Sequence, residues 1–236
     1  MTEPQFSIRG LIIAGTDTGV GKTVVACGLA AAAAYAGVSV GVIKPVESGC
    51  MEKAGRLIPA DASILLEAAQ SGQTLNDVCP YPLKAPLAPS VAAKLEGVSI
   101  DPNDIVKIVN EALFEFEFTL VEPAGGLLSP LADKLDSLEL ARLVGLPILL
   151  VAPNKLGVIN HVRLCEKSIR SSGVLLWGIV LNQPSATPDE SALTNREEIE
   201  RFVKAPFVIE LPYVSMTPEM SWPSRELMSP LIERLR

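Results

Sequence analysis

The chain has 236 residues, of which 48% are hydrophobic, and a formal net charge of −7 at pH 7. This length predicts one α/β domain over residues 1–236, because a chain of this size buries roughly three-quarters of its unfolded surface. The acidic balance argues against nucleic-acid and anionic-membrane partners, which need clustered Lys and Arg, so we expect a small ligand.

The sequence carries no export or membrane signal. No apolar run approaches the length of a membrane span, and residues 1–4 lack the basic and apolar regions of a signal peptide. We therefore expect a cytoplasmic protein. Its four cysteines show no C-x-x-C spacing, which predicts reduced thiols and neither a disulfide framework nor a zinc site.

A glycine-rich turn joins the first predicted strand, residues 8–15, to a predicted helix, residues 22–36. Residues 15–23 read GTDTGVGKT, and this strand–loop–helix order is what a phosphate-binding loop needs. Lys22 would reach the terminal phosphates, and Thr23 would offer its hydroxyl to Mg²⁺. The loop is a variant, because Thr16 takes the place of the first glycine, and a glycine-rich turn with an incidental GKT is the alternative.

The second predicted strand, residues 38–43, is followed by Lys44 and Ser48. Ligands collect at the carboxyl ends of strands in open α/β sheets, so both side chains should face the crevice of the phosphate loop. A surface lysine is the alternative for Lys44. Residues 51–59 are predicted as a mobile loop, and a helix should begin near Asp61, which taken alone is typical of an N-cap.

A third strand, residues 119–122, ends at Glu122, where phosphate-loop proteins hold Mg²⁺. An exposed strand-end carboxylate is the alternative. Between the second and third strands, four prolines in residues 80–89 predict a stiff extended loop without regular structure. Helices are expected over residues 91–96 and 101–114.

The remaining chain alternates helices and strands. Helices are predicted over residues 138–144 and 190–202, and strands over residues 147–152, 174–181 and 207–211, before a helix-poor tail. Residues 153–161 are predicted as a loop that leads into a helix ending at residue 171. The start of that helix offers free N–H groups to an anion, and Asn182 could read a base edge. His161, the only histidine, is interpreted as structural. The alternation predicts a mostly parallel, doubly wound sheet.

In order and spacing, these motifs resemble the dethiobiotin synthetase family from about Gly10 to Glu219. The resemblance rests on GTDTGVGKT at 15–23, KPV at 44–46 with SG at 48–49, DA at 61–62, PY at 80–81 with Pro86 and Pro89, Glu122 with AGG at 124–126, KLGVINH at 155–161, and Asn182. It implies a P-loop NTPase fold.

The resemblance also assigns roles to residues. It implies a phosphate loop at Gly19, Val20, Gly21, Lys22, Thr23 and Val24, with nucleotide contacts at Pro123, Ala124 and Gly125. It implies magnesium ligands at Thr23, Asp61 and Glu122. It implies catalytic roles for Lys44, Lys22 and Thr18, and substrate contacts at Ser48, Gly157, Val158, Ile159 and Asn160. It implies an adenine pocket at Asn182, Gln183, Pro212, Tyr213 and Val214, with a ribose contact at Glu219.

One departure concerns Pro123, where the family commonly has glycine. A proline removes a backbone N–H that could face the nucleotide or substrate, and it fixes φ.

The family reaction joins CO₂ to 7,8-diaminononanoate and uses ATP, with Mg²⁺, to close a cyclic urea, often in a homodimer. It needs no Ser, Cys or His nucleophile, and the sequence shows no such constellation. A nucleotide-switch ATPase of the partition-protein type is the main alternative. Those proteins often carry a second lysine early in the loop, which residues 14–17 lack. An amidating synthetase of the cobyrinic acid kind usually adds a glutaminase domain, for which this length leaves no room.

Overall fold

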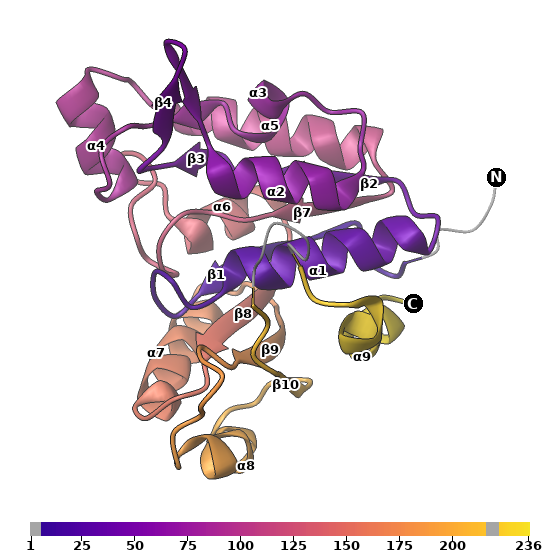
Figure 1. The fold of residues 1–236 in the computed structure, drawn as a ribbon. Helices are drawn as coiled ribbons and strands as arrows, with labels where there is room; N and C mark the ends of the chain where they lie inside the picture. The colour runs from indigo at the N-terminus through magenta and orange to yellow at the C-terminus, as the bar shows by residue number, and fades with distance from the viewer. Residues whose placement is uncertain (1–5, 216–221) are drawn as a thin grey trace.

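The computed structural model describes residues 6–215 and 222–236 (Figure 1). Its centre is a six-stranded sheet with the spatial order β10-β9-β8-β1-β7-β2, in which all neighbouring strands are parallel. The strands are β1 (Gly10–Gly15), β2 (Val40–Ile43), β7 (Phe118–Val121), β8 (Ile148–Pro153), β9 (Leu176–Asn182) and β10 (Val208–Leu211). The predicted parallel sheet is confirmed.

Helices cover both faces of this sheet (Figure 1). On one side lie α1 (Lys22–Tyr35), α2 (Ala60–Ala69) and α9 (Arg225–Leu235), and on the other α5 (Pro102–Glu115), α6 (Ser137–Val144), α7 (Val158–Ser171) and α8 (Ala192–Phe202). The side chains of β1 alternate between the two cores: Leu11 and Ile13 join the first, and Ile12 and Ala14 the second. Because β1 is buried on both faces, its sequence is a continuous apolar run. With helices on both faces of a parallel sheet, the doubly wound fold is confirmed.

Smaller elements lie between β2 and β7. The strands β3 (Val46–Glu47) and β6 (Tyr81–Pro82) pair in parallel, and the short helices are α3 (Leu75–Val78) and α4 (Pro89–Glu96). The expectation that residues 80–89 hold no regular structure was wrong for Tyr81–Pro82. Proline cannot donate to a neighbouring strand, but it can stand in a two-residue edge pairing of this kind.

Residues 51–59, predicted as a mobile loop, contain the antiparallel hairpin β4 (Met51–Lys53) and β5 (Arg56–Ile58). Ala54 and Gly55 both have positive φ, 52° and 75°, at the turn. Two such residues make the turn type that matches the twist of a hairpin. The sequence did not predict this hairpin turn because alanine, unlike glycine, does not favour positive φ.

The expectation of a helix-poor tail was also wrong, because α9 packs on α1 (Figure 1). Its buried residues Met228, Leu231, Ile232 and Leu235 recur at the spacing of one helix face. Pro230 lies inside the helix and removes one backbone donor. Burial of the apolar face outweighs that loss.

No helix in the described ranges has both the length and the apolar character that crossing a bilayer requires.

Met228 is fully buried, and its Sδ would lie 2.8 Å from a Cβ placed on Gly28 of α1. Replacing it with alanine leaves a cavity between α9 and α1. We expect Met228→Ala to lower the free energy of unfolding by about 2–5 kcal/mol, measured by urea denaturation. Leu193→Ala, at a position 87% exposed, should change it by less than about 0.5 kcal/mol, and equal losses would contradict the docking of α9.

Candidate active site

A cavity of about 500 Å³ opens at the carboxyl ends of β1, β7 and β2. It combines side chains from segments far apart in the sequence. Its lining residues are Thr18, Gly19, Gly21, Lys22, Thr23, Val24, Lys44, Glu47, Ser48, Asp61, Ile64, Glu122, Ala124 and Gly125. The central position of β1, between β7 and β8, places the loop that follows it in the middle of this edge.

The loop after β1 wraps the start of α1. Gly21 is the N-cap residue with φ 97°, and no side chain of the described residues caps α1. The first N–H groups of this helix are therefore free to bind an anion. Lys22 Nζ donates to the Gly125 carbonyl at 2.6 Å. Burial lowers the pKa of Lys22, although the nearby carboxylate of Glu122 opposes that shift.

A buried carboxylate lies beside the loop. Glu122 is 1% exposed, and its Oε1 accepts hydrogen bonds from Thr23 Oγ1 and Lys44 Nζ, each at 2.8 Å. Lys44 Nζ also pairs with Asp61 Oδ2 at 2.9 Å. Burial disfavours the charge of Lys44, but its two carboxylate partners outweigh burial and raise its pKa.

These contacts exclude the simpler interpretations of three residues. Lys44 is 3% exposed, so it is not a surface lysine, and Glu122 is not an exposed carboxylate. Asp61 lies in the first turn of α2, whose N-cap residue is Pro59, so Asp61 is not the N-cap.

The oxygen atoms around Glu122 fit a hard divalent cation. Glu122 Oε2 is buried and accepts no hydrogen bond from any described residue. The other oxygen, Oε1, accepts from Thr23 Oγ1 and Lys44 Nζ, and Lys44 Nζ is also paired with the Asp61 carboxylate. Within the described ranges no three His, Cys, Asp or Glu side chains form a metal cluster. The mixed set of one hydroxyl and two carboxylates suits Mg²⁺, which keeps several waters.

The end of β9 braces the phosphate loop from the other side. Asn182 is 7% exposed, and its Nδ2 donates to the Val20 carbonyl at 3.1 Å. Gln183 follows, with its N–H bonded to the Leu211 carbonyl. Pro212, Tyr213 and Val214 continue from β10 and do not line the cavity. Glu219 lies outside the described residues.

Comparison with known proteins agrees with this geometry. The chain matches the family model described as AAA domain over residues 9–221. It is 44% identical over 194 residues to the ATP-dependent dethiobiotin synthetase of Anaeromyxobacter sp. strain Fw109-5, covering 82% of this chain and 85% of the relative. The chain belongs to the dethiobiotin synthetase family.

Two further relatives share that name and cover nearly the whole chain. The Anaeromyxobacter dehalogenans strain 2CP-C protein is 38% identical over 229 residues, covering 97% of this chain and 100% of the relative. The Bacillus subtilis strain 168 protein is 35% identical over 227 residues, covering 96% and 94%. The similarity to these two relatives therefore extends over nearly the whole chain.

The residues that the resemblance assigns to substrate carboxylate binding lie elsewhere in the chain. Gly157 is the N-cap residue of α7, with Val158, Ile159 and Asn160 in the first turn, so the loop predicted over residues 153–161 was wrong from residue 158 onward. None of the four lines the 500 Å³ cavity, whereas Thr18 and Ser48 do.

Pro123, the position that departs from the family pattern, is buried and directly follows Glu122. It does not line the cavity, whereas the next two residues, Ala124 and Gly125, do. The carbonyl of Gly125 is the group that accepts from Lys22. The turn therefore still places a backbone polar group at the phosphate loop, although the N–H at position 123 is lost.

The sequence analysis gave no role to Glu47, although it lines the cavity and is 7% exposed. Burial raises the pKa of its carboxyl group, although the N–H of Ala62 and the charge of Lys44 oppose the shift. The trace of it in the sequence is a carboxylate directly after Val46, between two other candidate residues, Lys44 and Ser48.

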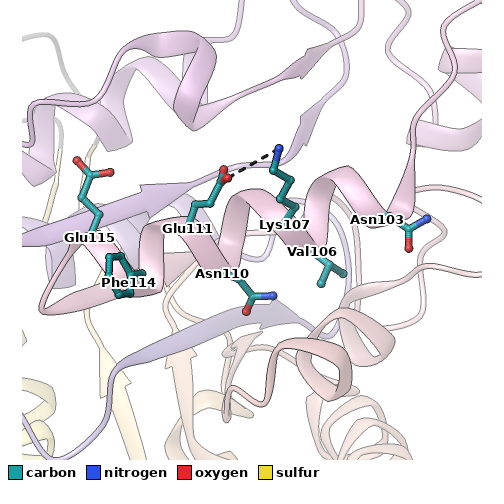
Figure 2. Close-up of a pocket in the computed structure, with 7 residues that line it drawn as sticks. All are labelled: Asn103, Val106, Lys107, Asn110, Glu111, Phe114 and Glu115. Carbon is teal, nitrogen blue, oxygen red and sulfur yellow. Dashed lines mark ion pairs between the residues drawn. The ribbon is translucent and has the colours of Figure 1, made fainter.

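A larger hollow of about 910 Å³ lies along the outer face of α5 (Figure 2). Its lining residues all come from that one helix: Asn103, Val106, Lys107, Asn110, Glu111, Phe114 and Glu115. The only ion pair drawn there joins Lys107 and Glu111 at 3.8 Å, and both side chains are well exposed. Small-molecule sites are concave and combine convergent polar groups, whereas this hollow is lined by a single helix, so we do not take it as the candidate active site.

The contact between Gly21 and Asn182 makes glycine essential in the loop. A Cβ at Gly21 would lie 2.2 Å from Asn182 Nδ2, and φ there is 97°. We expect Gly21→Ala to lower the affinity for ADP at least about tenfold in calorimetry, because the N–H groups no longer converge.

Gly37→Ala is the matched control. Gly37 also has positive φ, 82°, but nothing lies within 4 Å of its Cβ position. This variant should lose stability and keep its affinity for ADP. Equal affinity losses in the two variants would show a general effect of strained alanines.

Proposed function

We propose that this protein is an ATP-dependent dethiobiotin synthetase that converts 7,8-diaminononanoate, CO₂ and ATP to dethiobiotin, ADP and phosphate. One observation carries the proposal: Lys22, Lys44 and Glu122 line one cavity, and other residues of the phosphate loop line the same cavity. Family membership gives the reaction, and this constellation supplies the groups that the reaction requires.

The chemistry consists of three steps: carbamate formation, phosphoryl transfer and ring closure. A neutral amine of the substrate adds to CO₂ and loses a proton, giving a carbamate. A carbamate oxygen attacks the γ-phosphorus, and the bond to ADP breaks. The second amine then attacks the carbonyl carbon of the mixed anhydride, loses a proton and displaces phosphate, which closes the ring. No bond to the protein forms, so positioning and charge stabilisation supply the catalysis.

Each residue of the cavity has a part in this proposal. Lys22 and the N–H groups of the loop bind the terminal phosphates. Lys44 stabilises the negative charge shared by the carbamate and the transferring phosphoryl group. Thr18 and Ser48 orient the substrate amines. Thr23, Asp61 and Glu122 would hold Mg²⁺, which supplies positive charge to the β- and γ-phosphates when bound.

We extend the proposal to a cytoplasmic homodimer of one-domain subunits. Gly157, Val158, Ile159 and Asn160 start α7 and do not line the cavity of their own chain. In a homodimer, the free N–H groups of this helix start could bind the substrate carboxylate in the partner's cavity. On the adenine side, Asn182 ends β9 and contacts the loop, Gln183 follows it, and Pro212, Tyr213 and Val214 follow β10.

The direct test is an assay for dethiobiotin formation from 7,8-diaminononanoate. Product should require both ATP and CO₂, with one ADP released for each product. Hydrolysis of ATP without product, together with ATP-dependent association of the chain, would instead support a nucleotide switch.

Substitution of each of the two lysines should distinguish nucleotide binding from product formation. We expect Lys44→Met to reduce product formation at least about a hundredfold, while the affinity for ADP in calorimetry changes much less, because Lys22 and the loop remain. Lys22→Ala should weaken both, since its ammonium group lies at the loop itself. If Lys44→Met leaves product formation intact, or reduces both quantities equally, Lys44 does not have the proposed role.

The carboxylates should set the requirement for Mg²⁺. We expect Asp61→Asn and Glu122→Gln each to raise the Mg²⁺ concentration for half-maximal activity several-fold, because Mg²⁺ has few protein ligands to lose. Asp133→Asn, at an exposed position, is the control and should titrate like the parent protein. If both site variants titrate with Mg²⁺ like the parent protein, Asp61 and Glu122 are not magnesium ligands.

A further inference from the structure

Glu47 has a fixed backbone at the edge of the cavity. It ends the two-residue strand β3, which pairs with β6. The Glu47 carbonyl accepts hydrogen bonds from the Leu83 N–H at 2.7 Å and from Cys50 Sγ at 3.3 Å. The side chain therefore starts from a position set by two other segments.

Its carboxylate caps α2. Glu47 Oε1 accepts from the Asp61 N–H at 3.1 Å, and Oε2 accepts from the Ala62 N–H at 2.9 Å. The N-cap residue of α2 is Pro59, whose side chain has no acceptor. Two donors of the first helical turn are thus satisfied by a residue 14 or more positions earlier, and a negative charge lies at the positive end of the helix dipole.

This cap connects directly to the charged centre. The Asp61 N–H is bound by Glu47, and the Asp61 carboxylate is bound by Lys44 at 2.9 Å. The direction of the Asp61 side chain therefore depends on where α2 begins, which Glu47 determines.

The hydrogen bonds of Glu47 differ from those of Glu122. Both oxygens of Glu47 accept from backbone N–H groups, whereas Glu122 Oε2 has no partner among the described residues. Glu47 is thus suited to hold protein backbone, and Glu122 is suited to hold a cation.

We propose that Glu47 is a positioning residue that fixes the start of α2 and thereby aligns Asp61 with Lys44. The proposal rests on the roles that the proposed function gives to Asp61 and Lys44. Glu47 acts through Asp61 and needs no contact with a reacting atom.

Glu47→Gln tests this with little change of shape. The amide keeps one acceptor and directs its NH₂ group at a backbone N–H. We expect kcat to fall about tenfold and the Mg²⁺ requirement to rise several-fold. The KM for ATP, and the affinity for ADP without Mg²⁺, should change less than twofold because the phosphate loop is untouched. Glu67→Gln, at an exposed position of the same helix, should behave like the parent.

A double-mutant cycle with Asp61→Asn identifies the route of the effect. If Glu47 acts through Asp61, then Glu47→Gln should cost less than about twofold in the Asp61→Asn background. A full tenfold additional loss there would overturn the proposal. If Asp61→Asn alone changes neither kcat nor the Mg²⁺ requirement, the proposed metal site fails instead, so the two failures are distinguishable.

A rescue variant separates positioning from general damage to the fold. Pro59→Ser supplies an N-cap hydroxyl that can accept from the same N–H groups, those of Asp61 and Ala62. In the Glu47→Gln background it should restore kcat at least about threefold. A return of thermal stability without any recovery of kcat would show that Glu47 only stabilises the protein.

Discussion

The buried carboxylate of Glu122 is the interaction on which the site depends. A carboxylate with 1% exposure at the end of a strand needs a nearby positive charge, because an unpaired ion is costly away from water. Lys44 supplies that charge and is itself buried, so it needs the second partner that Asp61 provides. Asp61 belongs to α2, whose first turn is held by Glu47. One buried charge thus links the ends of β7 and β2, the start of α2 and strand β3.

The charges around the cavity explain how one site could accept both a cation and a polyphosphate. The carboxylates of Glu47, Asp61 and Glu122 border it, together with the ammonium groups of Lys22 and Lys44. Lys44 is bound by two of these carboxylates, and Lys22 is bound by the Gly125 carbonyl. A divalent cation at Glu122 and Asp61 would compete for the carboxylates that bind Lys44 and leave its ammonium group available for phosphate oxygens. Metal and nucleotide should therefore bind in a mutually dependent way.

The topology turns these local features into a site. Because all six strands are parallel, their carboxyl ends meet at one edge, and β1 lies between β7 and β8. The phosphate loop is therefore reached from one side by Lys44 and Glu122 and from the other by Asn182. The hollow along α5, although larger, has no such convergence because its lining residues all belong to one helix (Figure 2).

The sequence by itself determined the parallel sheet, the phosphate loop and the strand-end positions of Lys44 and Glu122. These follow from local patterns: apolar runs, the glycine spacing, and polar residues placed directly after strands. Helix α9 and the hairpin β4–β5 were not foreseen, since Pro230 and Ala54 favour other conformations and only packing or pairing overrides them. The cap of α2 by Glu47 and the bracing of the loop by Asn182 join residues 14 and 162 positions apart. Only the tertiary structure could decide them, because a hydrogen bond depends on distance in space and leaves no periodic trace in the chain.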